Sequence, residues 1–169
     1  PQAKVCAKDQ NVGMCLVALA WKAHPRWRLL LAGNRDEFHQ RPAAALAQWP
    51  GPSGIRAGRD LQSGGTWVGV DQRGRCAVVT NVRDPRAPAT QGPSRGALPA
   101  DYLESRSTAA AHAHDLAAHA GKYAPFNLLL ADEDSCQYLG NHPTMTQRAI
   151  TPGIHGMSNG SFDADWPKT

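Results

Sequence analysis

Short apolar segments, each followed by a turn-forming cluster, make up most of the pattern along this chain. Apolar runs of roughly four to eight residues that are bounded by such clusters are typical of β-strands. Pairs of these runs separated by short polar turns predict β-hairpins. The paired runs are residues 15–21 with 28–32, 66–70 with 76–80, and 126–131 with 137–140.

The segments between the predicted hairpins differ in composition. Residues 42–65 contain so many prolines and glycines that we expect an ordered loop there, without a helix or a central strand. Residues 82–95 share this character and predict a crossover connection. Residues 98–120 carry apolar side chains at helical spacing, which predicts one or two helices. Hairpins with helices inserted between them predict a single α+β domain with antiparallel sheets.

Composition narrows the class of protein. A length of 169 residues suits one domain, and 41% hydrophobic with 19% charged residues is typical of a globular protein. The net charge of +4 comes from scattered basic residues, so no nucleic-acid partner is expected. The longest apolar runs, residues 29–32 and 128–131, are too short to span a membrane. The four cysteines show no paired spacing, which favours a reducing, cytoplasmic location.

Cys15 directly follows Met14 and is the first candidate for chemistry. If Met14 is the initiator and is removed, the α-amino group of Cys15 lies beside its own thiol. An α-amino group titrates near about 7.7–8.0 and a cysteine near about 8.5, so this amine can act as base to the thiol. The alternative is that Cys15 is a small, buried apolar residue at the end of a strand.

A charged cluster, residues 34–38, follows the second predicted strand. The guanidinium of Arg35 could hold a thiolate or a substrate carboxylate, and Asp36 could accept a hydrogen bond from the α-ammonium group of Cys15. The alternative interpretation is a solvated turn.

Two asparagines and one tryptophan are further candidates. Asn81 ends the strand predicted at 76–80, and Asn159 lies between glycine-containing turns, so either side-chain amide could donate to a developing oxyanion. Both could equally be ordinary turn residues. Trp67 follows Gly64 and Gly65 and offers a flat surface for a ligand or for loop packing. The sequence contains no phosphate-binding loop or zinc motif, so neither a nucleotide nor a metal is implied.

Taken together, several motifs resemble the NRDE family (transport and Golgi organisation protein 2-like), which is named for the Asn-Arg-Asp-Glu found here at residues 34–37. The motifs occur in the family's order. They are Met14-Cys15-Leu16, Asn34 to Phe38 with Arg41-Pro42, Ala57-Gly58-Arg59-Asp60, Gly64-Gly65-Thr66-Trp67, Thr80-Asn81-Val82-Arg83, Ser94-Arg95-Gly96, Phe126-Asn127-Leu128 and Gly156-Met157-Ser158-Asn159.

The resemblance implies an Ntn-hydrolase-like αββα sandwich and a chemistry similar to that of bile-salt hydrolases and penicillin V acylases. By this analogy the protein is a cysteine hydrolase of nonpeptide C–N bonds that acts on a small-molecule amide. Cys15 would be the nucleophile and its amine the base. Arg35 and Asp36 would orient it, and Asn81 and Asn159 would surround the oxyanion.

The same resemblance implies a competing function, because family members are implicated in intracellular haem trafficking. The protein would then carry haem as a ligand and break no bond. Arg35 or Arg59 would face the propionates, and Trp67 would lie against the macrocycle. The sequence implies no other cofactor and leaves the oligomeric state open.

Both ends of the chain differ from the family's pattern. We expect residues 1–13 to be an upstream extension outside the fold, with Met14 as the natural start and residues 14–169 as the NRDE domain. If residues 1–13 stayed attached, the nitrogen of Cys15 would be an amide and could not act as base. Family members usually continue beyond Thr169, so we expect the C-terminal part of the domain to be missing here.

Overall fold

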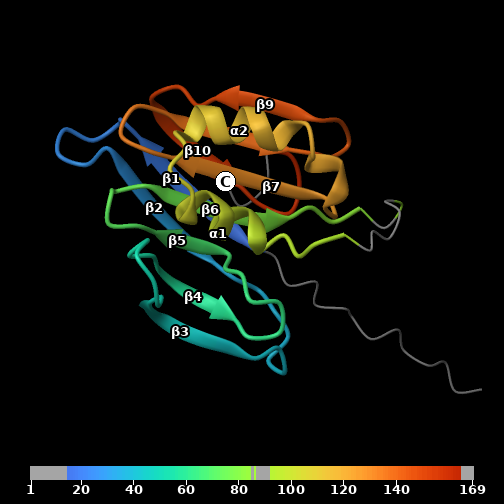
Figure 1. Cartoon of the computed structure of the whole chain (residues 1–169). Helices are drawn as coiled ribbons and strands as arrows, with labels where there is room; N and C mark the ends of the chain where they lie inside the picture. Colours follow the sequence, from blue (N-terminus) through green and yellow to red (C-terminus); the bar gives the residue numbers. More distant parts are fainter. Residues whose placement is uncertain (1–14, 85, 87–91, 165–169) are drawn as a thin grey trace, which may run out of the picture.

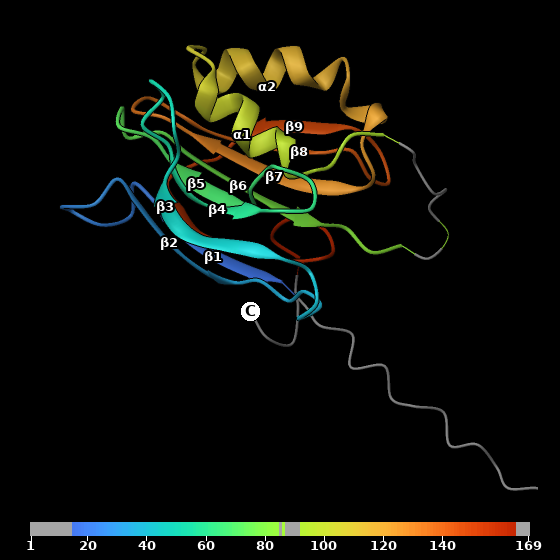
Figure 2. The ribbon, with the colours of Figure 1, turned by 60° about the horizontal axis from the view of Figure 1, so that its bottom comes forward.

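Two antiparallel sheets and two helices form three layers in the computed structural model, which describes residues 15–84, 86 and 92–164. The smaller sheet has the strand order β10-β1-β2, and the larger has the order β3-β4-β5-β6-β7-β8-β9. Figure 2 shows the helices on one side of the larger sheet and β1 and β2 on the other.

The elements have the following bounds. The smaller sheet contains β1 (Leu16–Trp21), β2 (Leu29–Asn34) and β10 (Gly153–Met157). The larger sheet contains β3 (Ala43–Gln48), β4 (Arg56–Asp60), β5 (Val68–Val70), β6 (Cys76–Asn81), β7 (Phe126–Ala131), β8 (Cys136–Gly140) and β9 (Thr146–Ala149). The helices are α1 (Ala97–Glu104), α2 (Ala109–Ala117) and the short 3₁₀ helix η1 (Ala120–Lys122).

Strands β6 and β7 lie in the middle of the stack and are buried on both faces. Because side chains alternate along a strand, Val79 and Leu128 face the core beneath the helices, whereas Val78 and Leu129 face the smaller sheet. Burying a side chain such as Leu128 stabilises the fold by roughly 1.5–3 kcal/mol. These strands therefore join the two cores of the domain.

The core between the sheets gives the smaller sheet its position. Val17, Leu19 and Trp21 alternate along β1 and point at the larger sheet, where they meet Tyr138 and other apolar side chains. The inward face of the small sheet is therefore fixed by packing, and with it the residues at the start of β1.

The α+β class with antiparallel sheets is confirmed, as are the three hairpins and the two helices. The described residues supply the α, β and β layers of the expected αββα sandwich, and none of them forms a helix over the outer face of the small sheet. Neither α1 nor α2 has the length and apolar character to cross a membrane within the described part of the chain. The proposed division at residue 14 stays a prediction, since residues 1–14 lie outside the described residues.

The expectation of an ordered loop without a central strand over residues 42–65 is wrong, because this segment contains the edge strand β3 and, inside the sheet, β4. Every residue of β3 is exposed, so the strand has no alternating pattern to reveal it. It lies at the edge of the larger sheet and carries an irregularity between Ala44 and Ala47, where the register with β4 shifts. Edge strands tolerate such breaks.

Candidate active site

Cys15 lies immediately before β1 and is held by contacts from two distant segments. Its main-chain nitrogen donates a hydrogen bond to Oδ1 of Asn159 at 2.9 Å, and its carbonyl oxygen accepts one from Oγ of Ser158 at 2.8 Å. The Sγ atom lies 3.4 Å from the main-chain nitrogen of Asp36, which donates to it. The residue is half-buried. The backbone of Cys15 is thus fixed while its thiol stays accessible.

The topology explains why these segments meet. Strand β1 is the central strand of the small sheet, with β2 on one side and β10 on the other. Leu16 pairs with Asn34 of β2, and Val17 pairs with Met157 of β10. The residues that follow β2 and β10 therefore lie beside the residue that precedes β1, although they are far apart in sequence.

A buried polar network holds the segment after β10 against the larger sheet. Asn127 donates through Nδ2 to the carbonyl oxygens of Ser158 at 3.0 Å and Gly160 at 2.7 Å, and Thr80 donates to Ser158 O at 2.7 Å. The hydroxyl of Tyr138 donates to Oδ1 of Asn127 at 2.8 Å. Because buried polar groups are costly when left unpaired, this network fixes the position of the neighbouring Asn159.

A cavity of about 310 Å³ opens in front of the Cys15 thiol. Five predicted site residues line it, together with residues that sequence reasoning did not single out. The predicted ones are Cys15, Arg35, Asp36, Trp67 and Asn81; the additional ones include Glu37, Arg41, Asp60 and Arg95. A smaller hollow of about 100 Å³ adjoins the cavity and is lined partly by Val17, Leu31 and Val78. The site thus combines a polar cavity with an apolar recess beside one thiol.

The guanidinium of Arg35 stacks over the ring of Trp67, with its Cζ atom 4.2 Å from the ring centroid. Its Nη2 atom also lies 3.4 Å from Oε2 of Glu37. A Cβ on Gly58 would lie only 2.8 Å from the Trp67 ring, so the absence of a side chain there permits the ring to pack. The stacking pair therefore depends on a glycine in β4.

Arg41 and Asp60 form a tight pair on another wall of the cavity. Oδ2 of Asp60 accepts from Nε of Arg41 at 2.9 Å and from Nη2 at 2.6 Å. Oδ1 accepts from the main-chain nitrogens of Gln62 and Ser63. Burial alone would raise the pKa of Asp60, but these hydrogen bonds and the charge of Arg41 outweigh it and lower the pKa.

The predicted site residues do not all have the contacts expected of them. The described contacts between Asp36 and Cys15 involve the main chain of Asp36. Asn159 is buried and does not line the cavity: its Oδ1 accepts from Cys15, and its Nδ2 donates to the carbonyl oxygen of Asn81 at 2.6 Å. Asn159 therefore positions the main chain of Cys15 without lining the cavity.

Arg59, expected to contact a ligand, does not line the cavity. Its guanidinium stacks on Trp49, 4.8 Å from the ring centroid, and its Nε donates to the carbonyl oxygen of Gly64 at 3.1 Å. The next residue, Asp60, takes a place in the cavity wall instead, because side chains alternate along β4. Within this motif Asp60 lines the cavity and Arg59 does not, so a ligand contact of Arg59 stays a prediction.

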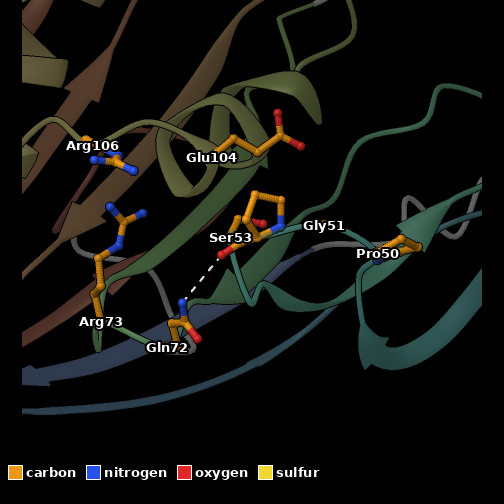
Figure 3. A pocket seen from close by; sticks show the side chains of 8 residues that line it. Pro50, Gly51, Ser53, Gln72, Arg73, Glu104 and Arg106 are labelled. Atoms are coloured by element: carbon orange, nitrogen blue, oxygen red, sulfur yellow. Dashed lines mark hydrogen bonds between the residues drawn. The ribbon is translucent and has the colours of Figure 1, made fainter.

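A larger hollow of about 540 Å³ lies elsewhere, between the β3–β4 turn and the C-terminal end of α1. Figure 3 shows Arg73, Glu104 and Arg106 around it. None of the predicted site residues lines this hollow. The guanidinium of Arg73 already donates hydrogen bonds to the carboxylate of Asp71 and to main-chain carbonyl oxygens. Within the described ranges no three His, Cys, Asp or Glu side chains gather as a metal site would require.

Comparison with known proteins places the chain in a family. Residues 14–169 match the family described as Transport and Golgi organisation 2. The Transport and Golgi organization protein 2 homolog of Bos taurus is 33% identical over 167 residues, and that of Homo sapiens is 30% identical over 167 residues. Each alignment covers 92% of this chain and 60% of the relative, so the chain spans less than two thirds of their length.

Among solved structures, penicillin V acylase from Agrobacterium tumefaciens aligns with a TM-score of 0.42 and 13% identity, covering 84% of this chain and 45% of that one. The family match covers nearly the whole chain, and the chain therefore belongs to the Transport and Golgi organisation 2 family.

Proposed function

We propose that this chain carries the nucleophile of an N-terminal cysteine hydrolase that cleaves nonpeptide amide C–N bonds. The observation that carries the proposal is the setting of Cys15. Its thiol lines a cavity, and its nitrogen is held 2.9 Å from Oδ1 of Asn159. A nucleophile whose own backbone nitrogen is fixed in this way needs no separate histidine base once that nitrogen is a free amine.

The chemistry requires that Cys15 be the first residue of the mature protein. With Met14 attached, the nitrogen of Cys15 is an amide and cannot accept the thiol proton. As a free α-amine it takes that proton, the thiolate attacks the carbonyl carbon, and the amine returns the proton to the departing nitrogen. Water then hydrolyses the thioester and restores the thiol.

Two groups at the cavity are suited to the oxyanion. The main-chain nitrogen of Asp36 already donates to Sγ of Cys15, and Asn81, which carries a side-chain amide, lines the cavity. Donors fixed near the position of a developing oxyanion lower the barrier because they need no rearrangement during the reaction. Asn159 serves as a positioning residue, since both ends of its amide are already bonded.

Haem carriage, the competing function, fits these residues less well. Ligand pockets usually measure roughly 300–1,000 Å³, so a cavity of about 310 Å³ suits a small molecule better than a macrocycle. Among the described residues that line it, Cys15 is the single one of a type that ligates haem iron. Arg59, expected to face a propionate, stacks on Trp49 instead.

We further propose that the protein works in a reducing compartment, as the cytoplasm is. The three cysteines in the described part, Cys15, Cys76 and Cys136, are all free thiols. A thiol nucleophile also requires reducing conditions to remain active.

The proposal can be tested with a chain that begins at Met14 and is processed to expose Cys15, as verified by intact mass. The substrates are 4-nitroanilides of short and medium fatty acids, and the measurements are release of 4-nitroaniline and the mass of the acylated protein. We expect turnover with a thioester at Cys15. The form that retains residues 1–14 should be slower by roughly 100-fold or more, because general base catalysis is lost.

Cys15→Ala is the matched control. If the processed chain releases 4-nitroaniline no faster than this variant, the hydrolase proposal is wrong. A parallel titration with haem, followed by its absorbance, separates the alternative. A chain that binds haem stoichiometrically and forms no thioester would support the trafficking function instead.

A further inference from the structure

The three arginines of the cavity differ in how many of their donors are already used. Arg35 lies beside Glu37 and stacks on Trp67, and Arg41 is paired with Asp60. Arg95 donates from Nη1 to the carbonyl oxygen of Pro125 at 3.0 Å. In the described part of the chain it has no ion pair with a carboxylate. A guanidinium carries five N–H donors, so most of those of Arg95 remain available to a ligand.

Arg95 is also held in a rigid setting. It lies between Ser94 and Gly96, directly before α1. The carbonyl oxygen of Gly96 accepts from the main-chain nitrogen of Thr66 at 3.0 Å, and a Cβ on Gly65 would lie 2.3 Å from the carbonyl group of Gly96. This close approach fixes the backbone of Arg95 against the wall of the cavity that carries Thr66 and Trp67. A preorganised guanidinium loses little freedom when it binds an anion.

The electrostatic surroundings favour an anion at this position. Burial lowers the pKa of Arg95, and the positive charge of Arg41 lowers it further, while Glu37 partly opposes the effect. The cation thus has unfavourable surroundings when the cavity holds water alone. A carboxylate in the cavity would accept charge-assisted hydrogen bonds and relieve that cost.

We propose that Arg95 binds a carboxylate of the substrate, so that the substrate class is a small N-acyl amino acid. This inference rests on the proposed function. Arg95 lines the cavity of about 310 Å³ in front of Cys15. The adjoining apolar hollow of about 100 Å³ is lined by residues such as Val17 and Leu31. Cys15 lines both. The acyl chain therefore occupies the hollow, the carboxylate of the amino acid meets Arg95, and the amide between them lies at the thiol.

A matched pair of alkylating reagents tests the role of Arg95 in the full chain. N-bromoacetylglycine carries a carboxylate, and N-bromoacetylglycinamide is its neutral counterpart. With either one, Sγ of Cys15 forms a bond to carbon, bromide leaves, and the thiol proton passes to solvent. The rate is measured at the Cys15 peptide by mass spectrometry, in a Cys6→Ser background. Burial raises the pKa of Cys76 to about 11 and that of Cys136 to about 12, so both thiols react poorly.

We expect the anionic reagent to alkylate Cys15 at least about tenfold faster than the neutral one, relative to their rates with free cysteine. Arg95→Gln should remove this preference, and Arg95→Lys should retain part of it. The neutral reagent should react with all variants at similar rates, which shows that the site is still folded. Arg59→Gln, outside the cavity, should leave the preference unchanged.

The outcomes separate this inference from the proposed function. If Cys15 reacts rapidly with both reagents and Arg95→Gln changes neither rate, the carboxylate site is wrong and the hydrolase proposal stands. If Arg35→Gln and not Arg95→Gln removes the preference, Arg95 is not the anchor. If Cys15 reacts with neither reagent, both in the full chain and after residues 1–14 are removed, its thiol is not accessible and both proposals fail.

Discussion

Arg75 and Arg95 show two opposite uses of the same side chain. Arg75 precedes β6 and its side chain is 6% exposed. Its Nε donates to Asp71 at 2.8 Å, and its two Nη atoms donate to the carbonyl oxygens of Leu103, Ser105 and Ser107 at 2.7–2.9 Å. It therefore ties the end of α1 and the segment after it to the β5–β6 turn. Arg95, in contrast, has one described hydrogen bond and lines a cavity.

The difference teaches how to separate arginines that stabilise the fold from those available to a ligand. A guanidinium such as that of Arg75, with four donors bonded to protein acceptors, contributes to stability, and its removal weakens the pairing of those acceptors. A guanidinium that lines a cavity with donors to spare contributes little to stability and can bind an anion. Arg41 is intermediate, since its partner Asp60 also lines the cavity. The ranking Arg75, Arg41, Arg95 should therefore hold for the loss of stability.

The largest effect is expected from Arg75→Ala. The side chain of Asp71 is fully buried, and the substitution leaves its charge with fewer partners. Breaking a buried ion pair in this way costs about 3–5 kcal/mol. Urea denaturation followed by tryptophan fluorescence should show this loss in the free energy of unfolding. The matched control is Arg73→Ala, which also removes a contact with Asp71 but from a side chain that is 40% exposed, and it should cost about 1 kcal/mol or less.

The distinction between structural and available arginines would be wrong if Arg75→Ala and Arg73→Ala caused the same small loss in the free energy of unfolding. The carbonyl oxygens at the end of α1 would then be satisfied by Arg73 or by water, and Arg75 would not be needed to hold this segment. Arg95→Ala should lie near the mild end of the same series.

An intermediate effect is expected from Arg41→Ala. The carboxylate of Asp60 loses both bonds from Arg41 but keeps those from the main chain of Gln62 and Ser63. A hydrogen bond to a charged group is worth about 1.5–3 kcal/mol, and partial exposure of Arg41 reduces this, so we expect a loss of about 1–2 kcal/mol. Denaturation midpoints measured beside those of Arg75→Ala give the order directly, and a larger loss for Arg41→Ala would reverse it.

Much of the fold could be predicted because it follows local patterns. The hairpins of β1 with β2, β5 with β6 and β7 with β8 are built from apolar runs around polar turns. Strands β3 and β10 lack such a pattern. The first is entirely exposed, and the second contains Gly153 and Gly156 and owes its place to pairing with β1. Pairing across such a distance is set by packing of the whole domain, which local sequence does not report.

The candidate site was predictable as a set of positions but less so as a set of contacts. Cys15, Arg35 and Asn81, which lie in motifs that resemble the family's, all line one cavity. The partners of each side chain depend on tertiary geometry. Asn159 bonds Cys15 from behind, Arg59 points away, and Arg95 was not singled out although it lies within a matching motif.

The smallest effect concerns pH and distinguishes the carboxylates that arginines hold. The pKa of Asp60 is lowered from 3.8 in the folded protein, so its charged form adds stability at neutral pH. That contribution is lost as the pH falls below about 4 and through the folded pKa. The advantage of the wild type over Asp60→Asn in urea denaturation should therefore shrink between about pH 6 and pH 3.

Asp101 supplies the control of opposite sign. Partial desolvation raises the pKa of this exposed carboxyl and Glu104 raises it further, so its charged form costs a little stability at neutral pH. The stability of the wild type relative to Asp101→Asn should therefore increase as the pH falls. A difference between the wild type and Asp60→Asn that stays constant down to about pH 3 would mean that neither Arg41 nor the main-chain donors of Gln62 and Ser63 favour the charged carboxylate. The pairing of Arg41 with Asp60 would then add no stability, and Arg41 would join Arg95 as an arginine available to the ligand.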